Sequence, residues 1–247
     1  MKVFIAAVLL ALVSIIGATS AQEPGLTDQL AVVKQVSGVL ECRVISGNQP
    51  CGTDRFMLTV QADGSRMLRS NTQMPSRGMQ IDIAIQVDSD FRPLQAYTSN
   101  YSEGKFFGTG LFAIEDNQLT AMVQTPDAIK TEIIEVPAQF SMLLHPVSAD
   151  GWHFGHYDKA KGGVQVLSRC TVGAARDSVR CGMRTVELEY LSDETLTVPA
   201  GTFKTERYRF GDDTEVWLTG PDNMVVQHVY NTFGTRYQLT ALEISDL

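Results

Sequence analysis

The densest group of side chains suited to acid–base chemistry lies in residues 150–159. It contains His153, His156, Tyr157 and Asp158. Imidazole titrates near neutral pH, so a pair of histidines beside a carboxylate or a phenol can exchange protons with a substrate. These four residues are therefore the candidate catalytic residues. Two other interpretations remain open: the two histidines are ligands of a metal, or the segment is a loop whose rings plug the end of a sheet.

Large apolar side chains are concentrated in the middle of the chain, where Phe106, Phe107, Phe112 and Met122 stand. Phenylalanine and the flexible methionine suit a cavity for an apolar ligand, so these four are the candidate ligand-binding residues. The alternative is that they belong to an ordinary hydrophobic core.

The usual catalytic signatures are absent from the sequence. It has no Gly-x-Ser-x-Gly, no His-Glu-x-x-His, no Cys-x-x-Cys and no glycine-rich phosphate loop opening a helix. We therefore predict no cofactor and no metal site. His228 shares one face of a predicted strand with Val226 and Tyr230, which favours a position in the core or lining a barrel.

The four cysteines fall into two local pairs, Cys42 with Cys51 and Cys170 with Cys181. An even number in close pairs is typical of disulfides in an exported protein. The spacing is not that of zinc sites, and no histidine stands beside the cysteines at ligand spacing. The sequence favours two disulfides, each joining the strands of one hairpin.

Apolar and polar residues alternate along most of the chain, which predicts β-strands with one buried and one solvated face. The clearest run is residues 79–87, and residues 56–61, 186–190 and 237–241 repeat the pattern. Turn sequences such as Ala62-Asp63-Gly64 separate the runs. We predict an all-β fold, an antiparallel meander that forms a barrel or a strongly curved sheet.

Two segments depart from this pattern. Residues 26–36 are compatible with one short N-terminal helix, and residues 137–163 fit neither period and predict a long crossing loop. We expect a single β-rich domain over residues 22–247. The two cysteine hairpins raise the alternative that this domain consists of two related halves joined by the loop.

The first 21 residues have the order of a secretory signal peptide: Lys2, an uncharged apolar run, and small residues up to Ala21. The apolar run is shorter than the roughly 20 residues that a membrane span requires. Without Lys2 the chain carries 19 basic and 28 acidic residues, a net charge of −9. Such a chain has no general attraction for nucleic acid. We predict a periplasmic or secreted protein that does not span the membrane and binds no nucleic acid; its oligomeric state is left open.

Residues 195–242 contain a recognisable order of motifs. Val198-Pro199-Ala200-Gly201-Thr202-Phe203 makes a turn, Trp217-Leu218 ends a strand, and Tyr237-Gln238-Leu239 lies in a closing strand. This order resembles a family of uncharacterised exported β-sheet proteins of Gram-negative bacteria. The resemblance implies a periplasmic β fold and brings no catalytic residues.

Two functional hypotheses follow. The first is an exported β-barrel-like protein that binds an apolar or amphipathic small molecule or an envelope component. The alternative is a periplasmic lyase, isomerase or hydrolase that uses the His/Tyr/Asp cluster for acid–base catalysis.

Overall fold

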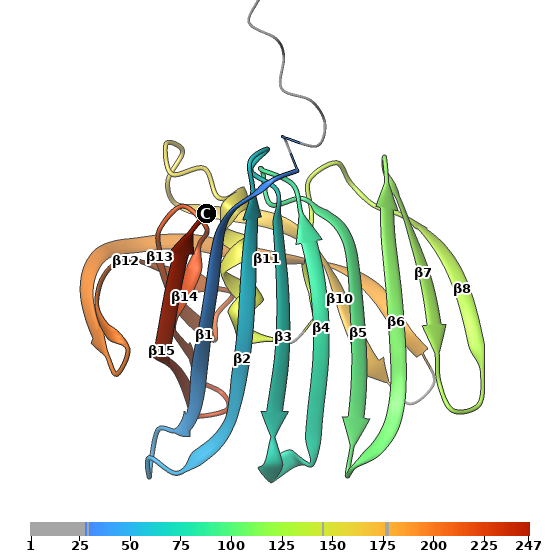
Figure 1. Cartoon of the computed structure of the whole chain (residues 1–247), viewed down its shortest axis with the longest axis horizontal. Coiled ribbons are helices and arrows are strands. Elements are labelled where there is room, and N and C mark those ends of the chain that lie inside the picture. Colours follow the sequence, from blue (N-terminus) through green and yellow to red (C-terminus); the bar gives the residue numbers. More distant parts are fainter. Residues whose placement is uncertain (1–27, 29, 145, 176–177) are drawn as a thin grey trace, which may run out of the picture.

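The computed structural model describes residue 28 and residues 30–144, 146–175 and 178–247, which form one 15-stranded sheet (Figure 1). The predicted signal peptide lies outside the described residues. The sheet order is β8-β7-β6-β5-β4-β3-β2-β1-β15-β14-β13-β12-β11-β10-β9. Each half of the chain therefore forms its own meander, and the first strand joins the last.

The strands of the first half are β1 (Val32–Val44), β2 (Pro50–Gln61), β3 (Arg66–Met74), β4 (Met79–Val87), β5 (Pro93–Ser102), β6 (Lys105–Glu115), β7 (Gln118–Gln124) and β8 (Ile129–Glu135). Those of the second half are β9 (Ser141–Leu143), β10 (Val164–Ala175), β11 (Ser178–Val198), β12 (Gly201–Phe210), β13 (Thr214–Thr219), β14 (Met224–Tyr230) and β15 (Thr235–Asp246). Two 3₁₀ helices are present in the described residues, η1 (Pro75–Arg77) and η2 (Val147–His156).

The all-β prediction is confirmed, and so is the strongly curved antiparallel meander. Of the strand pairs described, only β9 with β10 is parallel. The run predicted at residues 79–87 is β4, whose Ile81, Ile83, Ile85 and Val87 are all buried while the residues between them are less so. The predicted Pro199 turn is also present, since Val198 pairs directly with Gly201.

The long strand β11 contributes to the curvature. Its first part pairs with β10 and its second part with β12, with a register shift between Tyr190 and Ser192. Bulges of this kind bend a strand and increase its twist. In Figure 1, β10 and β11 consequently run behind the wall formed by the early strands.

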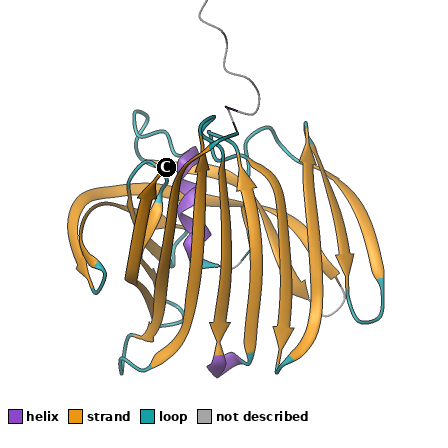
Figure 2. Ribbon diagram, viewed as in Figure 1, coloured by secondary structure: helices purple, strands orange, loops and turns teal. Residues whose placement is uncertain are grey.

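The segment predicted as a crossing loop is instead partly regular. It contains β9 and the ten-residue η2, which lies within the curve of the sheet (Figure 2). The short N-terminal helix prediction was wrong over Val32–Val36, which open β1. The alternation of apolar and polar residues that marks a strand is interrupted here, because Val32 and Val33 are consecutive apolar residues. Both are more than a third exposed.

The inside of the curve is filled by side chains. Residues from both halves meet there, among them Leu40, Leu58, Phe140, Leu188 and Leu239, each at most 1% exposed. The sheet is therefore barrel-like but packed. Among the described residues, no helix has the length and apolar character needed to cross a bilayer.

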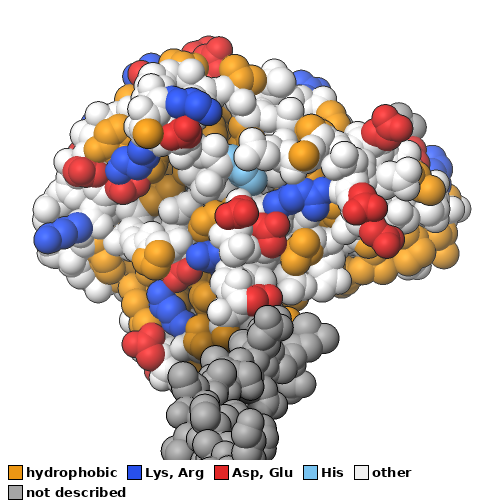
Figure 3. All heavy atoms as spheres, turned by 90° about the horizontal axis from the view of Figure 1, so that it is seen from above, with side chains coloured by type: hydrophobic (Ala, Val, Ile, Leu, Met, Phe, Trp, Pro, Cys, Tyr) orange, Lys and Arg blue, Asp and Glu red, His pale blue; other side chains and the backbone are white. Residues whose placement is uncertain are grey.

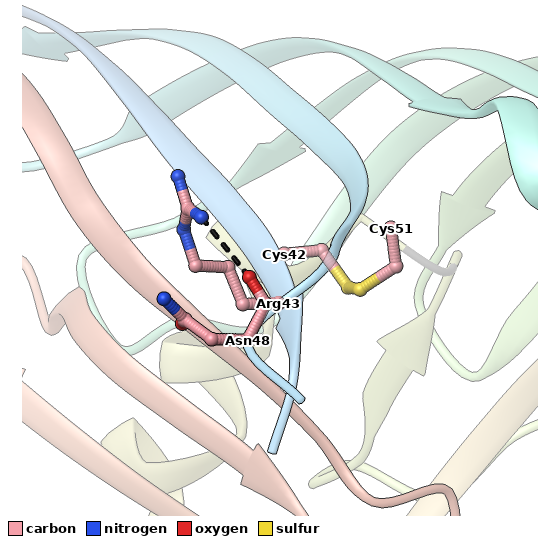
Figure 4. The surroundings of a disulfide bond; sticks show 4 residues. All are labelled: Cys42, Arg43, Asn48 and Cys51. Carbon is pink, nitrogen blue, oxygen red and sulfur yellow. Dashed lines mark hydrogen bonds between the residues drawn. A yellow bond between two sulfur atoms is a disulfide. The ribbon is translucent and has the colours of Figure 1, made fainter. Parts of the chain in front are cut away.

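Both predicted disulfides are formed. Cys42 and Cys51 join β1 to β2 with their Cα atoms 5.1 Å apart, and Cys170 and Cys181 join β10 to β11 at 5.2 Å. Beside the first link, the Arg43 guanidinium donates a hydrogen bond to the Asn48 carbonyl oxygen at 3.1 Å across the hairpin loop (Figure 4). Each disulfide thus closes a loop within one hairpin.

We predict that replacing Cys170 and Cys181 with serine lowers the free energy of unfolding by about 2–3 kcal/mol, the chain-entropy value for a loop of about ten residues. The fold should survive, because the rest of the buried apolar core is unchanged. Chemical denaturation of the variant, of the matched Cys42/Cys51 double-serine variant and of the parent chain would measure this. Loss of the folded state in either variant would contradict the prediction.

Candidate functional site

Helix η2 is held against the inner face of the sheet by polar contacts along its length. The Ser148 backbone N–H donates to Asp54 Oδ2 at 2.8 Å, and Trp152 Nε1 donates to the Asp222 carbonyl oxygen at 3.2 Å. A Cβ atom at Gly151 would collide with the carbonyl oxygen of Asn223. Glycine at this position therefore lets the helix approach the β13–β14 turn closely enough for Asp150 to reach the sheet.

The Asp150 carboxylate is the centre of a buried polar cluster. Its Oδ2 lies 3.1 Å from His228 Nε2 and accepts a hydrogen bond from the Tyr230 hydroxyl at 3.1 Å. Its Oδ1 lies 3.7 Å from His153 Nε2, which is too long for a hydrogen bond. The side chains thus come from η2 and β14.

A second contact extends the cluster to β9. The Ser141 hydroxyl lies 2.7 Å from His153 Nδ1, and the His153 ring stacks on Phe210 with centroids 5.0 Å apart. Arg169 covers the same phenylalanine ring at 4.9 Å. Ser141, His153 and Asp150 have the residue types of a nucleophilic triad, but they are only 3%, 1% and 6% exposed. None of them lines any of the four pockets described below.

Burial and pairing set the protonation states in this cluster. Burial alone would raise the pKa of Asp150, but the adjacent imidazoles of His153 and His228 outweigh it and hold that pKa well below its usual range. Burial lowers the pKa of His153 and favours its neutral form. Burial, with the negative charge of Asp150, raises the pKa of Tyr230 well above its ordinary value. Asp150 is therefore the anionic acceptor, beside a neutral His153 imidazole and a neutral Tyr230 phenol.

The four candidate catalytic residues do not converge on one point. His153 faces the buried cluster, whereas His156 and Asp158 line a separate pocket of about 430 Å³ with Lys161, Ser168 and others. Tyr157 is buried, and its hydroxyl donates to the Gly163 carbonyl oxygen at 2.7 Å.

The pocket that contains His156 and Asp158 is mostly polar. Asp158 is paired there with Lys161 at 3.3 Å, and burial lowers the pKa of His156. The described residues contain no group of three or more His, Cys, Asp or Glu side chains placed to hold a metal ion.

An apolar groove of about 530 Å³ lies on the outer face of the sheet, across β3–β8. This face consists of the residues that point away from η2. We call it the outer groove; it is lined by Met67, Ala84, Gln86, Gln95, Ala96, Tyr97, Leu111, Phe112, Ala113, Thr120, Met122 and Thr131. Two of the four candidate ligand-binding residues, Phe112 and Met122, are in this set.

The candidate ligand-binding residues differ in exposure. Met122 is 43% exposed in the outer groove, while Phe112 borders it with its side chain buried. Phe106 lies at the start of β6 and packs edge-on against Tyr101, and Phe107 is half-buried at a register shift beside it. Neither Phe106 nor Phe107 lines the groove.

Two further pockets are open to solvent. One of about 650 Å³ is lined by Asp193, Glu194, Lys204, Glu206 and neutral residues of β11–β13, and one of about 370 Å³ lies beside the Cys51 hairpin. Neither contains a residue singled out from the sequence for catalysis or ligand binding.

The sequence does not match any protein family or any curated protein. The structure is similar to a solved β-barrel-like protein of domain of unknown function DUF1849 from Brucella abortus, with a TM-score of 0.54 and 13% identity over 88% of this chain and 100% of that one. At this identity the likeness shows the fold alone. The expected resemblance to uncharacterised β-sheet proteins is therefore supported at the level of fold.

Two weaker similarities were found. A DUF1089 family protein from Pseudomonas aeruginosa has a TM-score of 0.40 at 12% identity, covering 70% of this chain and 87% of that one. A Bacteroides fragilis protein with a YmcC-like fold has a TM-score of 0.29 at 10% identity, covering 87% and 97%. Scores this low bear on neither fold nor function.

We predict that Asp150→Asn destabilises the protein at pH 7 by about 2–4 kcal/mol, because it removes the buried charge that His228 and Tyr230 are arranged to meet. The depressed pKa of Asp150 means that its contribution is present above the unfolded pKa and is lost as pH falls below about 4. The difference between parent and variant should therefore shrink in acid.

Urea denaturation over a pH series would measure this difference. Asp158→Asn is the matched control, because Asp158 lies just after η2 but has a side chain that is 44% exposed. It should leave the free energy of unfolding near that of the parent. Equal effects of the two substitutions would contradict the role assigned to Asp150.

Proposed function

We propose that this is an exported binding protein that holds the apolar part of a neutral amphipathic molecule in the outer groove. The observation that carries the proposal is the groove itself, whose volume of about 530 Å³ lies within the range of small-molecule sites, about 300–1,000 Å³. An envelope component of the same chemistry would meet the same surface.

The lining of the outer groove suits a flexible apolar chain. Met67 and Met122 present flexible, unbranched side chains, Leu111 adds a branched aliphatic one, and Tyr97 adds a ring with a polar tip. Ala84, Ala96 and Ala113 are the smallest lining side chains, so they leave space between the larger ones. Methionine adapts to irregular apolar partners at little cost, which favours a ligand without a rigid shape.

The polar residues of the groove favour an uncharged head group. The lining contains no charged side chain; its polar members are Gln86, Gln95, Thr120 and Thr131, with the Tyr97 hydroxyl. Gln95 Nε2 already donates to Gln86 Oε1 at 2.7 Å, so the two amides are held in one orientation. Such a rim can accept and donate hydrogen bonds but offers no ion pair.

The inner face is a poorer candidate for ligand binding. The space within the curve is occupied by η2 and by large side chains such as Phe140 and Leu119. A ligand there would have to displace the Asp150 cluster. The outer groove needs no such rearrangement.

Export is the second part of the proposal, and it is supported by the two disulfides, which are typical of oxidising compartments. We predict that the protein isolated from the periplasm or medium of its host begins at Gln22, the residue after the predicted cleavage site. Intact-mass and N-terminal analysis would measure this. Recovery of the uncleaved chain from the cytoplasm would contradict it.

We predict that Met122→Gln weakens binding of an uncharged fluorescent apolar probe, N-phenyl-1-naphthylamine, roughly tenfold, because the ligand then buries less apolar surface against the groove. Met57→Gln is the matched control: Met57 is 45% exposed on the same face, close to the 43% of Met122, but does not line the groove. It should leave the affinity unchanged.

A steric variant gives an independent test. Ala113→Trp should fill the floor of the groove and abolish probe binding while the inner core is untouched. Equal binding by the parent, Met122→Gln and Ala113→Trp proteins would reject the groove as the site. Native mass spectrometry of protein purified from its own host would then identify the natural ligand.

A further inference from the structure

Strand β8 ends the sheet, and within the described residues no strand pairs with its outer edge. Ile129 is 68% and Ile133 is 67% exposed, although both are large and apolar. Figure 3 shows hydrophobic side chains gathered at the lower right, on the side of the molecule where β6–β8 lie. An unpaired strand with exposed apolar side chains is a template for pairing with another strand.

The ladder between β7 and β8 fixes which backbone groups of β8 are available. At one end the Thr125 N–H donates to the Ala128 carbonyl oxygen, and at the other the Val136 N–H donates to the Asn117 carbonyl oxygen, both at 2.8 Å. Hydrogen-bonded and non-hydrogen-bonded pairs alternate along an antiparallel ladder. The even-numbered residues of β8 therefore bond to β7, and the odd-numbered residues direct their N–H and C=O groups outward.

The same alternation separates the side chains of β8. Thr131 lines the outer groove, so the odd-numbered Ile129 and Ile133 lie on the outer face with it. Lys130 and Glu132 lie on the opposite face. The outward backbone groups and the exposed isoleucines thus belong to the same residues.

We infer that β8 pairs antiparallel with β8 of a second copy of this chain, about a twofold axis at Thr131. In this register Ile129 lies opposite Ile133 of the second copy, and Lys130 lies opposite its Glu132. The twofold axis repeats each pair. The odd-numbered residues supply all the backbone hydrogen bonds, as the β7–β8 ladder requires.

Neighbouring registers are less favourable. An axis at Glu132 would place two glutamates directly opposite each other, and like charges in that position are destabilising. An axis at Ile133 would place Glu132 opposite Ile134 and lose both lysine–glutamate pairs. Moving one β8 strand by a single residue along the other would place the isoleucines of the two copies on opposite faces of the joined sheet. The charge pattern thus favours an axis at Thr131. The pairing across the axis does not require Lys130 and Glu132 to lack partners within their own chain.

This inference is independent of ligand binding. It does predict that two outer grooves lie on either side of the axis, because Thr131 lines the groove and Met122 pairs with Thr131 across β7–β8. The isoleucine pairs would then extend the apolar surface between the two grooves.

Sedimentation velocity of the full mature chain over a concentration series tests the inference. Lys130→Glu and Glu132→Lys should each weaken the dimer roughly tenfold, because each converts two attractive cross-strand pairs into repulsive ones. The double variant Lys130→Glu/Glu132→Lys restores opposite charges and should recover the parent's dimerisation. A monomer at every concentration, or a dimer insensitive to the single reversals, would overturn the proposal.

A cysteine variant tests the register directly. Thr131→Cys should form an intermolecular disulfide, because hydrogen-bonded partners in antiparallel strands have Cα atoms about 5.5 Å apart, within disulfide range. Thr120→Cys is the matched control: this residue is also an exposed outer-face threonine, but it lies one strand further from the axis, on β7. Cross-linking of Thr120→Cys but not of Thr131→Cys would reject the inference. A covalent or stoichiometric adduct with an unrelated extended peptide, formed in place of a dimer, would reject it too.

Discussion

The arrangement of this protein depends on the contact between η2 and the inside of a curved sheet. A sheet bent this strongly leaves a space between its two walls, and η2 fills it. The helix is short and carries the buried Asp150, which would be costly to bury alone. Its carboxylate is stabilised by His228 and Tyr230 from β14, so the position of the helix and the curvature of the sheet depend on each other.

That mutual dependence accounts for the polar character of the interior. Asp54 accepts hydrogen bonds from Ser70 and from the Ser148 backbone, while Asp222 pairs with Lys34 at 2.7 Å and Arg66 at 2.9 Å. These carboxylates lie in or beside the contacts of η2. Burial raises the pKa of Asp54, whereas the pKa of Asp150 is depressed, so the contributions of these two buried aspartates to the free energy of unfolding depend on pH with opposite sign. These contacts fix how η2 packs against the sheet.

The parts of the fold that follow from local pattern were predictable. Alternation along Met79–Val87 gives β4 directly, and the close spacing of the cysteines gives both hairpin disulfides. Helix η2 was not predictable, because a 3₁₀ helix has no apolar periodicity of 3.6 or 2 residues, and two glycines within it resemble a loop. His228 was expected in the core or lining a barrel, and it is buried.

The partners within the candidate site could not be predicted at all. Asp150 and His228 are far apart in the sequence, and nothing in either segment encodes their contact. Ser141 and His153 are only 12 residues apart, but their contact depends on the parallel pairing of β9 with β10, which no local pattern predicts. The outer groove was predicted only in part. Met122 was a candidate ligand-binding residue because of its residue type. Tyr97 and Leu111 line the groove because of the strand register, which the sequence alone does not give.

The pairing of β1 with β15 has a consequence for the order of assembly. A chain emerges from a ribosome or a membrane channel with its N-terminus first, so β1–β8 are available long before β15 exists. The early meander can form its hairpins locally, but one edge of β1 stays unpaired until the last residues arrive. Closure of that ladder requires contacts between opposite ends of the chain, which are slow to form. During this interval the unfinished molecule exposes β1 in addition to β8, and it is at its most vulnerable to aggregation immediately before synthesis ends.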